Sequence, residues 1–278
     1  MLEGKFGQFS EQVSAVWFWN KLKLRGGSRG KGGEERLIYF KGGFIALVDA
    51  LASKIRNMGG IIELNAPVSD IRLTGRNWTT TTSGSIVSSD RVIVTTALPL
   101  IADMVRSWAD RSYLTQLKRI SYIGNICLIL ELDRSLSSTY WLNINDLGFP
   151  FVGVIEHTNF QRPETYGGRH IVYLSKYLPP TDHLYFMSSD EFLEYALPYL
   201  QTMFPALNKS WILSHHLLRA RWSQPIVEKN YSALIPPEDG PSEGFHICSM
   251  AQIYPEDRGT NYAVREGRRI GKRLAELF

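Results

Sequence analysis

The stretch that decides the fold runs from Gly244 to Gly267 and reads GFHICSMAQIYPEDRGTNYAVREG. Its first six residues are mostly apolar and predict a buried strand, and a helix is predicted from about Thr260 to Leu277. The loop between them ends at Gly259, so the N–H groups of the helix N-terminus follow a residue that has no Cβ. This order is compatible with a ligand site, and it is equally compatible with an ordinary strand, loop and helix that end a domain.

The predicted C-terminal helix carries two glycines on the face that we expect to be buried. That face comprises Ala263, Gly267, Ile270, Gly271 and Leu274. Each glycine costs a helix about 1 kcal/mol relative to alanine. We therefore expect a close neighbour along this face, either a strand or a cofactor.

Residues 37–100 alternate helical and extended patterns. Apolar residues at helical spacing follow Gly42-Gly43 as far as Met58, and Gly59-Gly60 ends that helix. The predicted strands are 37–40, 61–64, 68–73, 78–82, 85–87 and 91–96. A helix, a short antiparallel meander and a buried strand that ends at Ala97 predict an α+β arrangement derived from an α/β fold.

Residues 101–243 predict a separate lobe with a half-open antiparallel sheet. The expected strands are 122–132, 139–144, 151–156, 171–175 and 212–221, and the expected helices are 101–108, 112–117 and 190–204. Near the N-terminus, the basic, glycine-rich stretch 25–33 lacks the spacing of a P-loop and of a dinucleotide fingerprint. It therefore predicts a flexible loop.

Composition narrows the possible classes of protein. The 278 residues are 44% hydrophobic and 21% charged, which excludes wholesale disorder. A net charge of +4 gives no support for nucleic-acid binding, and two cysteines are too few for a disulfide framework or a four-thiolate metal site. No stretch reaches the roughly 18 apolar residues of a membrane span, and no signal peptide is recognisable. We expect a cytoplasmic protein without a membrane span.

Three segments resemble the FAD-dependent oxidoreductases of the flavin amine oxidase, protoporphyrinogen oxidase and phytoene desaturase superfamily. They are 39–71, 90–99, and 221–225 together with 253–267. The resemblance implies a partial FAD-binding domain of the amine-oxidase type with an antiparallel-sheet substrate lobe. It assigns 1–37 and 101–243 to the substrate lobe, and 38–100 and 244–278 to the FAD domain.

The resemblance also implies which residues contact FAD. The backbone of Val68 would hold the adenine, Ala97 would lie on the strand that leads back to the cofactor, and Trp222 would flank the flavin or simply pack. The C-terminal block would contribute Asp257 near the ribityl chain, Gly259 at the pyrimidine edge, and Arg258, Asn261, Tyr262 and Ala263 near the ring or its phosphates. No catalytic acid or base and no metal ligand emerges.

The chain departs from this family at its start. The family begins with a strand, a Gly-x-Gly-x-x-Gly turn and a helix, and none of these is present before the Tyr39 segment. We expect a shortened, split or genuinely short chain with an exposed sheet edge and exposed apolar surface. A homodimer or an N-terminal partner segment would cover that surface.

Three functions remain open. The first is hydride transfer from an unidentified small organic substrate to flavin. The second is a non-redox, flavin-dependent nucleotide-sugar mutase, in which basic residues such as Arg162, Arg169, Arg219 and Arg221 hold a diphosphate. The third is a non-catalytic fragment that binds a partner and holds no flavin.

Overall fold

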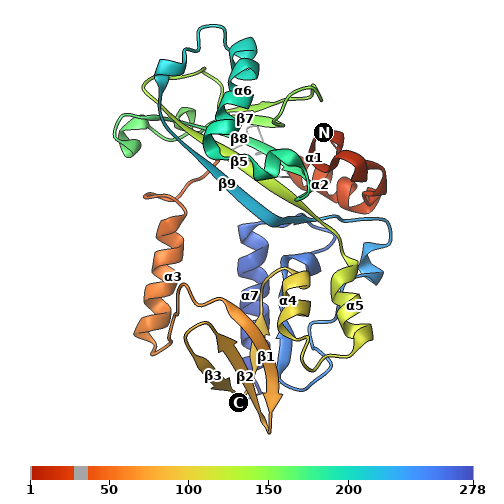
Figure 1. Ribbon diagram of the computed structural model, residues 1–278. Helices are drawn as coiled ribbons and strands as arrows, with labels where there is room; N and C mark the ends of the chain where they lie inside the picture. Colours follow the sequence, from red (N-terminus) through yellow and green to blue (C-terminus); the bar gives the residue numbers. More distant parts are fainter. Residues whose placement is uncertain (1, 28–36, 278) are drawn as a thin grey trace. The chain divides into compact units, whose positions relative to one another are not determined.

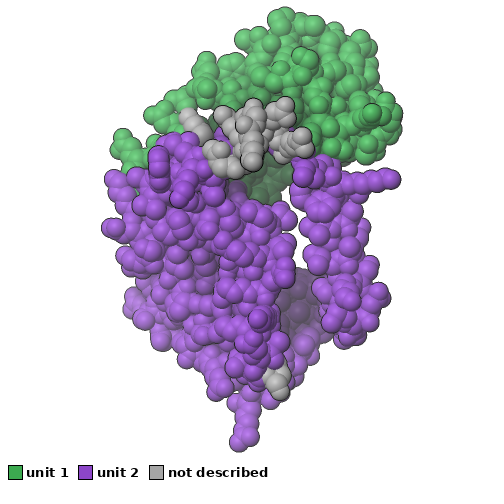
Figure 2. All heavy atoms as spheres, turned by 180° about the vertical axis from the view of Figure 1, so that it is seen from behind, with its two compact units in different colours: residues 1–13, 121–226 green, residues 14–120, 227–278 purple. Residues whose placement is uncertain are grey.

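The structure is a computed structural model, and it describes residues 2–27 and 37–277. The chain forms two compact units (Figure 2): unit 1 comprises residues 1–13 and 121–226, and unit 2 comprises residues 14–120 and 227–278. The predicted functional segments 1–37, 38–100, 101–243 and 244–278 have other boundaries and stay a prediction. Most of the predicted loop 25–33 lies outside the described residues.

Unit 1 is built on one antiparallel sheet in the order β6-β7-β8-β5-β9 (Figure 1). Its strands are β5 (Tyr122–Leu132), β6 (Trp141–Asn143), β7 (Gly153–Glu156), β8 (His170–Leu178) and β9 (Ile212–Pro225). Alternate residues of β5 are buried, as expected for a strand that packs mainly through one face. Leu128 stands opposite Leu174 on β8 and Leu217 on β9, so the register brings apolar side chains together.

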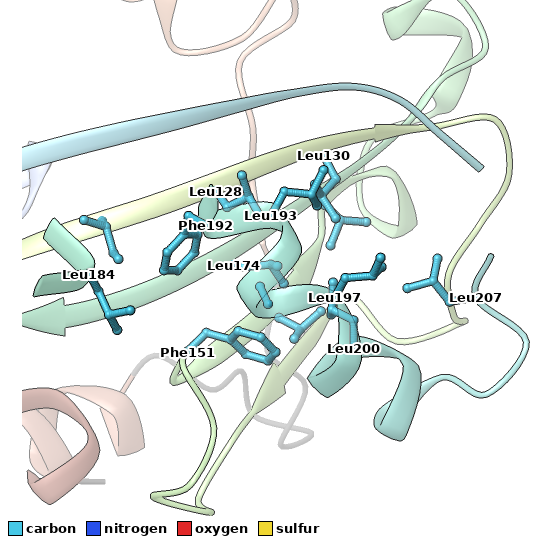
Figure 3. Close-up of a cluster of buried hydrophobic side chains, with 14 of the residues drawn as sticks. Leu128, Leu130, Phe151, Leu174, Leu184, Phe192, Leu193, Leu197, Leu200 and Leu207 are labelled. Atoms are coloured by element: carbon cyan, nitrogen blue, oxygen red, sulfur yellow. The ribbon is translucent and has the colours of Figure 1, made fainter. Parts of the chain in front are cut away.

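Helix α6 (Ser189–Met203) packs its apolar residues into the core of unit 1 (Figure 3). Phe151, Phe192 and Leu200 in this core are 0–1% exposed. The helix begins with a capping box, because the Glu191 N–H donates to Ser188 Oγ at 3.2 Å and the Ser188 N–H donates to Glu191 Oε2 at 2.7 Å. The short helix α1 (Leu2–Phe6) also belongs to this unit.

Unit 2 mixes helices with two small sheets. Its helices are α2 (Ala15–Gly27), α3 (Ile45–Asn57), α4 (Leu98–Met104), α5 (Arg111–Arg119) and α7 (Thr260–Ala275). An antiparallel sheet contains β1 (Val68–Thr74), β2 (Asn77–Thr82) and β3 (Ile86–Ser89), and a parallel pair contains β4 (Val92–Val94) and β10 (Phe245–Ile247).

Three aromatic rings form one part of the buried core of unit 2. Trp78 packs against Trp108 and Phe245 with ring centroids 5.2 and 5.3 Å away. Gly244 adopts a φ of +80°, and a Cβ there would lie 2.8 Å from the Asp90 carbonyl oxygen and 2.9 Å from Trp78 Nε1. A glycine is therefore required where the chain enters β10.

The structure confirms the predicted α+β class and the antiparallel lobe, and it corrects three details. Residues 37–40 and 61–64 were predicted as strands and form none. On α7, Ile270 and Leu274 are buried as expected, but Ala263, Gly267 and Gly271 are exposed, so the prediction of a buried glycine face was wrong. Among residues 2–27 and 37–277, no helix combines the length and apolar character that crossing a membrane requires.

Candidate functional site

The loop that precedes α7 is held in place by the first turns of α2. Lys21 Nζ lies 2.7 Å from Asp257 Oδ2, Asn20 Nδ2 donates to the Pro255 carbonyl oxygen at 3.3 Å, and the hydroxyls of Ser14 and Tyr254 are 3.2 Å apart. These contacts join residues that lie more than 230 positions apart in the sequence. The loop conformation is therefore fixed by tertiary contacts within unit 2.

Asp257 is oriented from two sides. Its Oδ1 accepts a hydrogen bond from the Arg258 N–H at 3.0 Å, while its Oδ2 faces the Lys21 ammonium. Lys21 itself lies over the Trp17 ring, with Nζ 5.0 Å from the centroid, and Trp17 is buried. A carboxylate oxygen has two lone pairs and can accept more than one hydrogen bond.

The N-terminus of α7 suits an anionic or electron-rich group. Its N-cap residue is Gly259, which supplies no side-chain cap, and its first turn contains no acidic residue. The first N–H groups of a helix have no partner within the helix and together carry about half a positive charge. A Cβ on Gly259 would lie 2.8 Å from Asn261 Oδ1, so a side chain at this position would displace that of Asn261.

Side chains in the first turns of α7 bind back to the loop. Arg265 lies over the Tyr262 ring, 4.8 Å from its centroid, and donates to Glu256 Oε1 at 2.9 Å. Tyr262 is half-buried, while Asn261 and Ala263 are exposed. Side-chain contacts thus join the loop to the first turns of α7, and this segment contains the predicted residues Asp257 to Ala263.

Farther along α7, ion pairs fix the helix to two acidic residues that precede β10, and one of these also contacts His246 within β10. Arg273 donates two hydrogen bonds to Asp239, at 2.7 and 3.0 Å, and His246 Nδ1 lies 2.7 Å from the same carboxylate. The hydrogen bonds from Arg273, and then that of His246, lower the pKa of Asp239 to about 2. Arg269 pairs with Glu238 and Glu266. This network anchors the helix that presents the candidate site.

The ends of the two parallel strands are also tied together. Ser249, two residues after β10, donates from Oγ to the Thr96 carbonyl oxygen at 2.8 Å. Ala97 follows directly, is buried, and is the N-cap residue of α4. The carboxyl ends of parallel strands are where ligands bind in α/β sheets, so Ala97 occupies a suitable position for its predicted role.

The other two predicted residues lie elsewhere. Val68 begins β1 and pairs with Thr82, and no described hydrogen bond connects it to the loop before α7. Trp222 lies on β9 in unit 1, where its ring meets Tyr122 at 5.6 Å and Arg221 at 5.4 Å. Asp257 to Ala263 thus belong to one continuous loop and helix start of unit 2, Val68 and Ala97 belong to other elements of unit 2, and Trp222 belongs to unit 1.

Sequence reasoning missed Ser14, Asn20 and Lys21, which support the site. The four-residue spacing of Trp17 and Lys21 indicates that they share a helix face. Nothing local in the sequence identifies Asp257 as the partner of Lys21, because the two residues meet only in the folded chain.

Comparison with known proteins gives one family match and several structural neighbours. The profile of the family described as flavin containing amine oxidoreductase matches residues 4–270. No curated protein matches the chain.

Three solved structures share the fold. A putative protoporphyrinogen oxidase from Exiguobacterium sp. 255-15 is 15% identical with a TM-score of 0.59, covering 77% of this chain and 48% of that one. An oxidoreductase from Methanosarcina mazei is 21% identical with a TM-score of 0.58, covering 75% and 49%. A reduced UDP-galactopyranose mutase is 15% identical with a TM-score of 0.56, covering 70% and 42%.

The chain thus spans about half the length of the solved structures that it matches. Identities this low show a shared fold, and the family profile shows more, because it covers nearly the whole chain. The predicted fold and the predicted superfamily are confirmed, and the cofactor that this membership implies is FAD. The chain belongs to the flavin containing amine oxidoreductase family.

Proposed function

We propose that this chain is the flavin-contacting part of an FAD-dependent oxidoreductase that acts on a small organic substrate. The main support is the segment 257–263, which lies inside the region matched by the family profile. Lys21 fixes its loop through Asp257, and its helix begins without a side-chain cap. A reducing cytoplasm is part of the proposal, because Cys127 and Cys248 are both free thiols.

The residues of the chain have distinct roles in this proposal. The α7 N-terminus stabilises negative charge on the group that it faces, and Gly259 keeps the approach free of a side chain. Lys21 holds the Asp257 carboxylate in position to accept hydrogen bonds from hydroxyl groups. When bound, FAD accepts a hydride from the substrate.

The mutase alternative has less support. Its diphosphate would need free guanidinium groups, but Arg169 pairs with Glu131, and Arg219 donates to the carbonyl oxygens of Tyr185 and Met187. Arg221 stacks on the Trp222 ring. These guanidinium groups are already engaged within unit 1 and do not form an open anion site.

Flavin binding tests the proposal directly. The purified protein is titrated with FAD, and the flavin absorbance and fluorescence are followed. Gly259→Leu should weaken binding at least about tenfold, because its side chain blocks the α7 N-terminus. Gly84→Leu is the matched control, since its position is open and its φ is not in the left-handed region. Equal affinities for the two variants would contradict the assigned site.

Substrate assays separate the remaining alternatives. If an amine, a polyene or a porphyrinogen reduces the bound flavin in the absence of air, the flavin absorbance is lost. That result supports the oxidoreductase. Turnover of a UDP-sugar without net oxidation would instead support the mutase. A protein that binds no flavin, either alone or together with the expected N-terminal partner segment, would favour the non-catalytic alternative.

A further inference from the structure

Unit 1 contains a cavity of about 200 Å³ beside α1, the short helix that contacts β8. Its wall is formed by residues within 3–9, 144–152 and 176–182, together with Ile123 at the start of β5. None of them belongs to the candidate site of unit 2. An engineered apolar cavity of about 150 Å³ in another protein binds benzene, so this cavity has room for a compound of about that size.

Aromatic and aliphatic side chains form most of the cavity wall. Phe6 of α1 is 0% exposed, and Phe151, which also belongs to the core shown in Figure 3, is 1% exposed. The Phe149 ring lies edge-on to that of Phe151, with the centroids 5.9 Å apart. Pockets with walls of this kind bind ligands mainly through apolar contact, and a few polar groups fix the orientation of the ligand.

Lys176 contributes an amine to this apolar cavity. Side chains alternate along a strand, so Lys176 shares a face of β8 with Leu174 and Leu178, which are both buried in the core of unit 1. Lys176 is half-buried, and no described residue gives its ammonium a hydrogen bond or an ion pair. Burial lowers the pKa of Lys176, while the Asp182 carboxylate acts in the opposite direction. A lysine in an apolar pocket is an activated nucleophile, because more of its amine is neutral.

Three carboxylates also line the cavity and determine its charge. Glu3 and Asp146 are exposed, whereas the Asp182 side chain is 30% exposed. The Lys5 ammonium lies over the Phe6 ring, 5.3 Å from its centroid, and Lys5 is not among the residues that line the cavity. Three negative charges beside one amine disfavour an anionic ligand. The cavity therefore suits an uncharged, apolar compound.

We propose that Lys176 and this cavity form a site for a small, uncharged, apolar aldehyde, which Lys176 binds reversibly as an imine. The neutral amine attacks the carbonyl carbon, a C–N bond forms, and the carbonyl oxygen becomes a hydroxyl. That hydroxyl then leaves as water, which carries away both hydrogens of the amine and the former carbonyl oxygen. A C=N bond remains, and no oxidant or reductant takes part. Asp182 lines the same cavity and can exchange protons in these steps.

The alternative is a purely structural lysine. A lysine can pack its stem against a core and keep its ammonium in water, and Lys176 would then react like any exposed lysine. Two observations favour the proposed site. The cavity leaves open space within unit 1 where the Lys176 side chain lies. Lysines that are removed from water are usually paired, whereas the described residues supply no ion pair to Lys176.

Reductive trapping tests the proposal on the purified chain. Sodium cyanoborohydride converts an imine of benzaldehyde into a stable benzylamine, and peptide mass spectrometry locates the benzyl group. Lys54 on α3 is the internal control, because it is exposed and forms no ion pair with a described residue. We expect Lys176 to be labelled at least about tenfold faster than Lys54, because burial keeps its amine neutral and the cavity holds the aldehyde beside it. Equal rates would overturn the proposal and indicate a structural lysine.

A variant that fills the cavity separates its contribution from that of the amine. A Cβ on Gly4 would lie 3.5 Å from Val152 Cγ1, and both residues line the cavity, so a leucine at position 4 enters it without a backbone clash. Gly4→Leu should slow the labelling of Lys176 at least about tenfold and leave Lys54 unchanged. Gly84→Leu is the matched control, because its Cβ meets nothing within 4 Å. An unchanged rate at Lys176 in a folded Gly4→Leu protein would overturn the proposal, and the wild-type comparison needs neither variant.

A charged analogue tests the assigned class of ligand. Relative to Lys54, para-carboxybenzaldehyde should label Lys176 at least about fivefold more slowly than benzaldehyde does, because the carboxylates of the cavity repel it. Glu3→Gln combined with Asp146→Asn should reduce that difference. Equal labelling of Lys176 by the two aldehydes would contradict the assigned class. These measurements use no flavin, so their outcome is independent of the proposed function.

Discussion

Units 1 and 2 belong to one chain but differ in how completely they bury their apolar residues. Unit 1 surrounds β5, an eleven-residue strand with a partner on each side, and packs α6 onto the sheet. Unit 2 relies on a three-residue parallel pair and leaves the apolar face of α3 exposed. The contrast teaches that an apolar pattern predicts a helix or strand, but only a neighbouring element allows it to be buried.

The largest expected effect comes from removing a core side chain of unit 1. Phe192 is 1% exposed, so Phe192→Ala should lower the free energy of unfolding by about 3–5 kcal/mol. Leu51→Ala on α3 should change it by less than about 0.5 kcal/mol, because Leu51 is exposed. Urea unfolding followed by circular dichroism measures both. Equal losses would show that α3 is packed in the isolated chain and would remove the contrast.

The next effect tests the glycine at which the chain enters β10 in unit 2. Gly244→Ala places a Cβ at a positive φ and against the Asp90 carbonyl oxygen, so it should cost about 2 kcal/mol or more. Gly75→Ala also has a positive φ but meets no atom within 4 Å, and it should cost about 1 kcal/mol. Thermal unfolding of the two variants compares them. A smaller loss for Gly244→Ala would mean that β10 enters unit 2 differently.

Sequence reasoning worked where a structure is determined by a contiguous pattern. It predicted 122–132, which is β5, and placed the helix at 190–204 within one residue of the bounds of α6. It failed at 61–64, because a strand requires a second segment that the described chain does not supply. It also failed to find Lys21, because the ion pair with Asp257 joins α2 to a loop at the far end of the chain.

A third prediction concerns the helix caps, which also differ between the units. α6 begins with a capping box, whereas α7 begins at a glycine without a side-chain cap. Ser188→Ala should therefore cost about 1 kcal/mol of stability. Ser189→Ala is the control, because the buried Ser189 hydroxyl has no hydrogen-bond partner among the described residues, and its removal should cost nothing. If the control costs as much as Ser188→Ala, the cap is not the cause.

The smallest expected effect is a pH dependence in unit 2. Hydrogen bonds from Arg273 hold the pKa of Asp239 at about 2, below its ordinary value of 3.8. The resulting stabilisation is present above about pH 4 and is lost as the pH falls toward 2. Because the side chain is 60% exposed, the effect should stay below about 1 kcal/mol and shrink with added salt.

Melting temperatures between pH 5 and pH 2.5, measured for the wild type and for Asp239→Asn, check this prediction. The variant should show a shallower fall with acid than the wild type. Identical slopes would mean that the interactions of the Asp239 carboxylate with Arg273 and His246 contribute nothing to the stability of unit 2.

The pairing of β4 with β10 has a consequence for synthesis on the ribosome. About 150 residues separate the two strands, and at translation rates of about 5–20 residues per second β4 waits roughly 8 to 30 s for its partner. All of the second stretch of unit 1 emerges during that interval. Unit 1 can therefore fold while β4 is still unpaired on the nascent chain. Chaperones should bind the nascent chain mainly during that interval.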